Sequence, residues 1–111
     1  MPDLAGGWAP EATEYWEGVV LFGVVSDTHG YFQPRLKALF RGVDRILHAG
    51  DIAAQGVIDA LAGIAPVVAV HGNVDRGRLA AAYPAWVDLD VEGHRLLLVH
   101  RADRVARAEP A

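Results

Sequence analysis

Three apolar segments, separated by stretches with helical spacing, constrain the fold of this chain more than any other feature. They are residues 19–26 (VVLFGVVS), 44–50 (DRILHAG) and 65–72 (APVVAVHG). The first is a continuous, β-branched run without alternation, which is typical of a strand covered on both faces. Two intervening segments, 34–40 and 53–64, carry apolar residues at helical spacing and are followed or interrupted by glycine. This order predicts a βαβαβ unit with right-handed crossovers and parallel strands.

The remaining sequence predicts one hairpin and two flanking segments. Residues 85–100 (AWVDLDVEGHRLLLVH) indicate two strands joined by a tight turn at Glu92 and Gly93. Residues 1–18, with several glycines and prolines and no sustained period, are expected to form an extension outside the core. We therefore expect one domain over residues 19–100, followed by a divergent tail over residues 101–111.

Composition excludes several classes of protein. The 111 residues are 52% hydrophobic, which suits one small globular domain. The net charge is −4 and the basic residues form no dense stripe, so binding to a nucleic-acid backbone is not expected. The chain has no cysteine, no apolar run long enough to span a bilayer and no visible secretory signal. We therefore expect a cytoplasmic protein without a disulfide framework or a thiolate metal site.

Polar side chains follow each of the three predicted parallel strands. Asp27 and His29 follow the first, Asp51 follows the second, and Asn73 and Asp75 follow the third. The carboxyl ends of parallel strands share one edge of a sheet, and ligands bind in the crevice beyond that edge. We therefore expect these side chains to converge.

Oxygen and imidazole ligands without thiolates suit hard or borderline divalent ions. His100, at the end of the last predicted strand, is a further candidate if that strand reaches the same edge. A carboxylate has two oxygens and can bridge two ions. Such an ion pair can lower the pKa of a shared water and stabilise an in-line phosphoryl displacement.

Three motifs in order, SDTHG (26–30), HAGDI (48–52) and VHGNVD (70–75), resemble the calcineurin-like metallophosphoesterase superfamily. The likeness is strongest to its small bacterial and archaeal phosphodiesterase branch and covers residues 19 to 100. It implies an α/β/β/α sandwich, of which this chain would have the parallel βαβαβ half and a hairpin, without the C-terminal strands. It also implies a metal-dependent phosphodiesterase that hydrolyses a small-molecule phosphate ester through a hydroxide activated by two metal ions.

The resemblance also implies roles for individual residues. Asp27 and His29 would bind the first ion, Asp51 would bridge both ions, and Asn73 and His100 would bind the second. Manganese is the expected metal, with magnesium, nickel, zinc and iron as alternatives.

The catalytic set implied by the resemblance is Asp51, Asn73 and Asp75, with Asp75 in a supporting role through hydrogen bonds.

The chain departs from the family pattern at three points. Val74 stands where many relatives have a histidine that protonates the leaving group, so no general acid is assigned. Arg101 stands where relatives have glycine, and no histidine follows His100, so the Gly-His-x-His motif is absent. We therefore expect a truncated or frameshifted C-terminus, and an uncovered edge that favours formation of a homo-oligomer.

Two other classes of function stay open. The absent histidines favour a catalytically impaired scaffold or protein-binding module with the same fold. A receiver-like phosphoacceptor domain would need a lysine at a late strand end, and the sole lysine, Lys37, lies in the first predicted helix. Of the remaining histidines, His48 is expected to be structural, whereas His71 either approaches a phosphate or is structural.

Overall fold

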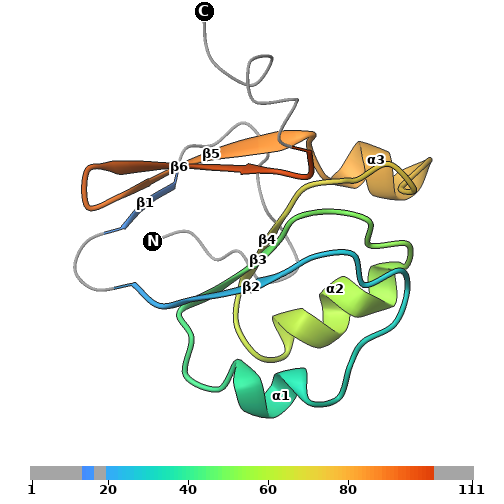
Figure 1. Cartoon of the computed structure of the whole chain (residues 1–111), viewed down its shortest axis with the longest axis horizontal. Helices are drawn as coiled ribbons and strands as arrows, with labels where there is room; N and C mark the ends of the chain where they lie inside the picture. The colour runs from blue at the N-terminus through green and yellow to red at the C-terminus, as the bar shows by residue number, and fades with distance from the viewer. Residues whose placement is uncertain (1–13, 17–19, 102–111) are drawn as a thin grey trace, which may run out of the picture.

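Two three-stranded sheets and one layer of helices make up the described part of the chain (Figure 1). The computed structural model describes residues 14–16 and 20–101. Three strands form a parallel sheet in the order β2-β3-β4: β2 (Phe22–Val25), β3 (Arg45–His48) and β4 (Val67–Ala69). The second sheet has the order β1-β5-β6: β1 (Glu14–Trp16), β5 (Trp86–Val91) and β6 (His94–Val99).

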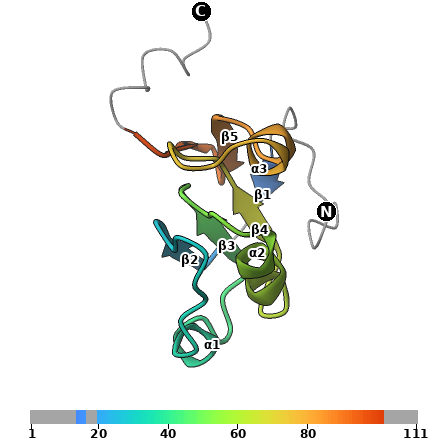
Figure 2. The same cartoon turned by 90° about the vertical axis from the view of Figure 1, so that its right-hand side faces the viewer.

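Helices α1 (Leu36–Leu39) and α2 (Gln55–Ala62) lie on the face of the parallel sheet opposite the second sheet (Figures 1 and 2). A third short helix, α3 (Arg78–Ala82), connects β4 to β5. The predicted parallel βαβαβ unit and the mixed α/β fold class are therefore confirmed. No helix in the described residues is both long enough and apolar enough to cross a bilayer.

Two hydrophobic cores lie on opposite sides of the parallel sheet. Successive residues of a strand point to opposite faces, so Ile46 and Leu47 of β3 enter different cores. Leu47 packs between the two sheets with Val68 of β4 and Leu89 of β5. Ile46 packs on the helix side, with Leu61 of α2. The parallel sheet is thus covered on both faces at its centre.

The hairpin was predicted correctly. β5 and β6 pair antiparallel, with Val91 opposite His94. Both turn residues have left-handed backbone, with φ of 52° at Glu92 and 79° at Gly93. Positive φ at both central residues is the requirement of a type I′ turn, whose twist matches that of the flanking strands.

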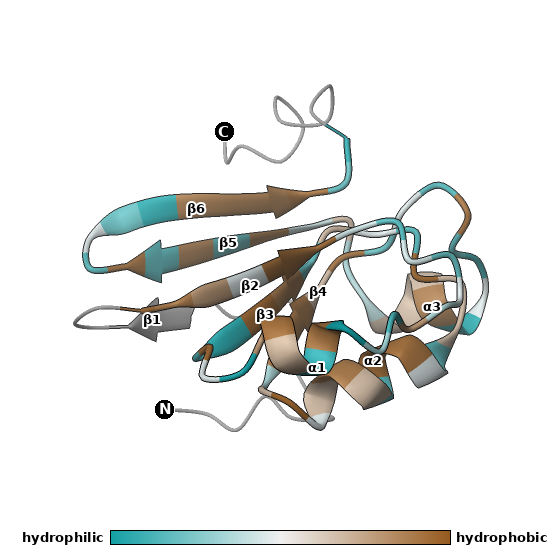
Figure 3. Ribbon diagram, turned by 60° about the horizontal axis from the view of Figure 1, so that its bottom comes forward, coloured by the Kyte–Doolittle hydropathy of each residue, from teal (hydrophilic) through white to brown (hydrophobic). Residues whose placement is uncertain are grey.

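The prediction that the first strand is covered on both faces was wrong at Val24. Val24 is 62% exposed, because β2 is an edge strand and no described element covers this side chain. β6 is the edge strand of the second sheet and lies on the same side of the molecule as β2 (Figure 2). Its Leu96 is 38% exposed. Figure 3 colours most of β2 as hydrophobic, although this strand is at the edge of its sheet.

Two elements were not predicted. Glu14–Trp16, which lie within the expected N-terminal extension, pair with β5 in parallel as β1. Arg78–Ala82, to which no element was assigned, form α3. The remaining residues of the predicted extension up to residue 13, and the predicted tail from residue 102, lie outside the described residues. The proposed domain boundaries stay a prediction.

Candidate metal centre

The loops after β2 and β3 lie side by side and are connected by backbone hydrogen bonds. The amide of Asp27 donates to the carbonyl of Gly50 at 2.9 Å, and the amide of His29 donates to the carbonyl of Asp51 at 3.0 Å. Gly30 donates to Ile52 at 2.7 Å. This ladder continues the pairing of the two strands beyond their ends, so the SDTHG and HAGDI motifs meet along their whole length.

Both loops have an unusual backbone conformation at the residues that carry the polar side chains. Asp27, His29 and Asp51 have φ of 57°, 49° and 57°, and Ala53 has 69°. Left-handed backbone in residues other than glycine costs on the order of 1–3 kcal/mol each and is concentrated at functional sites. The sequence gives no sign of this strain, because none of these positions is a glycine.

Four of the predicted ligand side chains converge beside these loops. Asp27, Asp51 and His100 each offer a ligand atom, and these atoms all lie within 4.8 Å of one another. The Nε2 atom of His29 lies 3.7 Å from an oxygen of Asp27 and 3.7 Å from Oδ2 of Asp51. The residues come from three different strand ends, so only the tertiary fold brings them together.

Asp51 lies at the centre of this cluster and is 6% exposed. Its Oδ1 atom accepts a hydrogen bond from the amide of Val74 at 3.0 Å. Its Oδ2 atom lies 3.4 Å from Nε2 of His100, on the same side as His29. One oxygen is therefore held by the backbone, and the other faces both imidazoles.

His100 has the tautomer that a metal ligand requires. Its Nδ1 atom lies 2.7 Å from the carbonyl oxygen of Ala49, which only accepts hydrogen bonds, so Nδ1 carries the proton. The Nε2 lone pair is then available on the side of Asp51. A backbone carbonyl bound to the second ring nitrogen is the usual way in which proteins orient metal-binding histidines.

Asp27 completes the negative charge of the cluster from its exposed side. The hydroxyl of Ser26 donates to this carboxylate and holds the pKa of Asp27 below its usual value. Desolvation opposes this effect, and the nearby His100 adds to it. Asp27 is therefore ionised at neutral pH and able to accept a cation.

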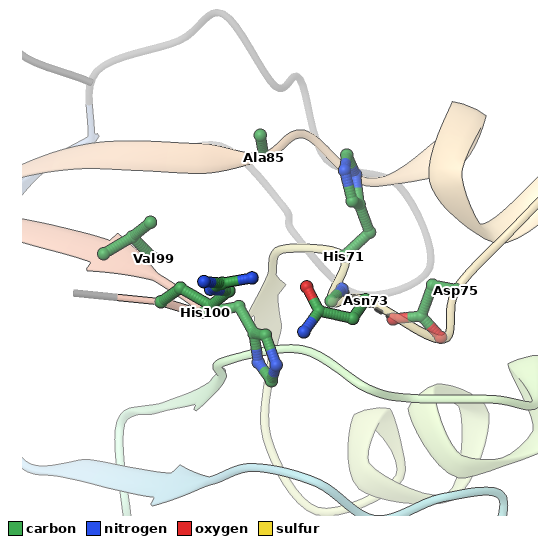
Figure 4. Close-up of a pocket in the computed structure, with 8 residues that line it drawn as sticks. His71, Asn73, Asp75, Ala85, Val99 and His100 are labelled. Carbon is green, nitrogen blue, oxygen red and sulfur yellow. Dashed lines mark hydrogen bonds between the residues drawn. The ribbon is translucent and has the colours of Figure 1, made fainter. Parts of the chain in front are cut away.

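Asn73 lines a cavity of about 270 Å³ next to the cluster, together with His71, His100 and Arg101. In Figure 4 the amide of Asn73 points toward the ring of His100. His71 donates from Nδ1 to the carbonyl of Tyr83 at 2.7 Å, which leaves its Nε2 atom without the proton in the neutral ring. The cavity is thus lined by polar groups on the side that adjoins the carboxylates.

Asp75 is buried, and its oxygens are occupied by backbone amides. It accepts hydrogen bonds from Ile52 at 3.0 Å, Ala53 at 2.8 Å and Gly72 at 2.8 Å. Burial alone would raise the pKa of Asp75, but these amides hold it below the usual value. Asp75 therefore connects the loop after β3 to the loop after β4, and its expected supporting role stays a prediction.

One further contact of the site was missed at the sequence level. The hydroxyl of Thr28 lies 3.0 Å from Nε2 of His48, which is fully buried at the end of β3. His48 was expected to be structural, but Thr28 was not considered. A threonine between two polar motif residues gives no periodic signal, and the hydrogen bond exists only because the two strands pair.

The donor set fits divalent cations. Carboxylate oxygens of Asp27 and Asp51 and the Nε2 atom of His100 face a common space, and the two carboxylates bring two negative charges within reach of the same ion. Thiolates are absent from the chain, so hard and borderline ions are favoured over soft ones.

This fold and this cluster define a metallophosphoesterase-type domain. A family model, the calcineurin-like phosphoesterase superfamily domain, matches residues 20–111, and the chain belongs to this family. It is 44% identical over 63 residues to a probable metallophosphoesterase of Methanocaldococcus jannaschii, a match that covers 52% of the chain and 33% of that relative. It is 35% identical over 86 residues to a probable metallophosphoesterase of Methanothermobacter thermautotrophicus, covering 73% of the chain and 49% of the relative. The chain therefore spans about a third to a half of the relatives that it matches.

Proposed function

We propose that this chain carries the metal-binding part of a phosphodiesterase that uses two divalent ions. The observation that carries the proposal is the convergence of Asp27, Asp51 and His100 from three strand ends, with their ligand atoms within 4.8 Å. Membership of the calcineurin-like phosphoesterase family supports the reaction class. The finer assignments, a diester substrate and two ions, are part of the proposal.

We assign the proposed ligands to two ions that share Asp51. Asp27 and His29 would hold one ion, and Asn73 and His100 would hold the other, with Asp51 contributing to both. Two bound ions would lower the pKa of a water molecule and neutralise the charge that develops on the phosphoryl oxygens. We propose manganese as the first metal to test, because carboxylate-rich sites with some imidazole suit it.

The residues that line the cavity beside the cluster support the proposal of an anionic substrate. Arg101 lines it together with Asn73 and His100. A guanidinium group forms strong, directed hydrogen bonds with phosphate oxygens. The substrate class that we propose is therefore a small-molecule phosphate ester, bound with its phosphate between the cluster and this cavity. The absence of cysteine suits a reducing compartment, and a cytoplasmic location is part of the proposal.

A protein-binding module is the second candidate, and one observation favours it. The open edge of the two sheets exposes Val24 and Leu96, which in a self-sufficient monomer would normally be covered or replaced by polar residues. A second copy of the chain is one partner that would cover this edge.

Hydrolysis of bis-p-nitrophenyl phosphate in the presence of Mn²⁺ separates the two candidates. The wild-type chain should release p-nitrophenol, and the Asp51→Asn variant should be slower by about 100-fold or more, because it removes the charge shared by both ions. Equal rates in the two proteins would rule out the proposal that this chain is a phosphodiesterase.

Elemental analysis of the purified protein provides an independent check. About two metal ions per chain are expected in the wild type, and fewer in His29→Ala, because that variant lacks a ligand of one ion only. Identical metal content in both proteins would contradict the assignment of His29.

A further inference from the structure

A chain of three hydrogen bonds runs beneath the cluster and includes no proposed metal ligand. The amide of Gly50 donates to Nδ1 of His48 at 3.1 Å. Nε2 of His48 lies 3.0 Å from the hydroxyl of Thr28, which in turn donates to the carbonyl of Ile52 at 3.4 Å. The first and last groups of this chain flank Asp51, and Thr28 lies between Asp27 and His29.

The chemistry of these groups fixes the direction of every bond. A backbone amide only donates, so Nδ1 of His48 has no proton and its Nε2 must carry the proton of the neutral ring. Nε2 therefore donates to Thr28, and the threonine hydroxyl uses its own proton for the carbonyl of Ile52. The imidazole must be neutral for this arrangement, because a proton on Nδ1 would face the amide of Gly50.

These hydrogen bonds connect the loops after β2 and β3, which are the loops with left-handed backbone. Asp27, His29 and Asp51 each have positive φ, and such residues keep this conformation only where surrounding contacts enforce it. The backbone ladder between the loops supplies some of these contacts. The hydroxyl of Thr28 joins the same loops from the buried side, through its bonds to His48 and Ile52.

We propose that His48 and Thr28 are positioning residues that hold the two ligand-bearing loops in their metal-binding conformation before any ion is bound. The inference rests on the proposed metal site for its functional meaning, but the order that it describes is a property of the metal-free chain. Neither residue touches the ion or the substrate in this proposal, and both act through Asp27, His29 and Asp51.

Amide hydrogen exchange of the metal-free protein tests this directly, with Thr28→Val and Thr28→Ser as a matched pair. Valine has the shape of threonine but no hydroxyl, whereas serine keeps the hydroxyl. In Thr28→Val, the amides of Asp27, His29 and Gly30 should exchange at least about tenfold faster, because valine removes both hydrogen bonds of the hydroxyl. In Thr28→Ser they should exchange at nearly the wild-type rate. The amides of the β5–β6 hairpin should be unchanged in both variants, which a general loss of stability would not allow.

The histidine ring itself gives a second readout, and this one needs no variant. Nitrogen-15 ring spectra of the metal-free wild type at neutral pH should show His48 as the Nε2–H tautomer. An Nδ1–H tautomer, a protonated ring, or equal loop exchange in the valine and serine variants would overturn the proposal.

Titration with Mn²⁺ then relates loop order to binding. Thr28→Val should bind Mn²⁺ about tenfold more weakly than Thr28→Ser, the lower end of the effect expected when a residue that orients metal ligands is lost. Equal affinities would overturn the positioning role. If the wild type bound no Mn²⁺, the proposed function would fail, and the exchange and tautomer results would still decide whether the loops are held in this way.

Discussion

At the scale of single residues, Gly72 is the point where the loop after β4 packs against Asp51. A Cβ atom built at this glycine would overlap Oδ1 and the backbone nitrogen of Asp51, and would lie 2.9 Å from its Cγ. Gly72→Ala should therefore push Asp51 out of the cluster and lower the free energy of unfolding by about 1–3 kcal/mol. Denaturation in urea and Mn²⁺ titration should both show the defect.

Gly56→Ala is the matched control for this substitution. No heavy atom lies within 4 Å of a Cβ built at Gly56, which is inside α2. Alanine is the better helix former, so this variant should gain up to about 1 kcal/mol and bind Mn²⁺ normally. A Gly72→Ala protein with wild-type stability and affinity would show that the two loops are not packed as described.

The buried imidazole of His48 predicts a pH dependence of stability in the metal-free protein. Burial lowers the pKa of His48 from 6.5 to about 4, against the opposing effects of Asp75, Asp27 and Asp51; His100 adds to the lowering. Above pH 6.5 the ring is neutral in both states and its full contribution to stability is present. As the pH falls from 6.5 to about 4, the unfolded chain takes up a proton that the folded chain does not. The free energy of unfolding should fall by about 3 kcal/mol in this window.

Urea denaturation at a series of pH values measures this dependence, and His48→Gln is the control because glutamine does not titrate. The variant should lose most of the slope between pH 6.5 and 4. The lowered pKa values of Asp27 and Asp75 act in a separate window, because their stabilisation is lost only as the pH falls below about 3.8. An unchanged slope in His48→Gln would contradict the assignment.

At the scale of elements, β2 and the end of α1 pack closely because Gly23 has no side chain. A Cβ atom built at Gly23 would lie 2.8 Å from Cδ1 of Phe40, the residue directly after α1, whose ring packs on the helix-side core. Gly23→Ala should therefore destabilise the protein by about 1–3 kcal/mol. In a Phe40→Leu background the same substitution should cost less, because the smaller side chain leaves room. Urea denaturation of the four proteins would give the coupling, and strictly additive costs would argue against this packing.

The elements that the sequence predicted well are those whose signal is local. Apolar residues recur at the strand or helix period in β3, β4 and α2, and the Glu92-Gly93 pair predicts the hairpin turn. β1 was missed because its three residues pair with β5, which is distant in the chain. The exposure of Val24 was missed for a related reason, since an apolar run does not show whether its strand is central or at an edge.

The candidate site divides in the same way. Asp27, His29 and Asp51 could be expected together from the sequence, because they follow neighbouring strands that pair in parallel. His100 follows β6 of the other sheet, so its place beside Asp51 was implied only by the family resemblance. The left-handed backbone of these residues and the contact between His48 and Thr28 could not be found. The backbone conformation and the contact both depend on which loops pair across the sheet, and the sequence of these loops does not show that pairing.

At the scale of the whole molecule, the proposed metal site connects the two sheets. Asp27 and Asp51 follow strands of the parallel sheet, whereas His100 follows β6 of the second sheet and reaches back toward Asp51. An ion shared by these side chains would bind only the folded arrangement, and it would join two layers that also share an apolar core. At a concentration of Mn²⁺ about 100 times its dissociation constant, the free energy of unfolding should rise by about 2.7 kcal/mol per independent site.

Thermal denaturation with and without Mn²⁺ checks this prediction. The midpoint should rise in the wild type and return to its metal-free value with a chelator. It should rise much less in Asp51→Asn and in His100→Ala, because each removes a ligand on a different sheet. His94→Ala is the matched control for His100→Ala: His94 is the exposed first residue of β6 and lies at the opposite end of that strand, so its variant should respond as the wild type does. A full response in His100→Ala would mean that the ion binds within the parallel sheet alone and does not hold the two layers together.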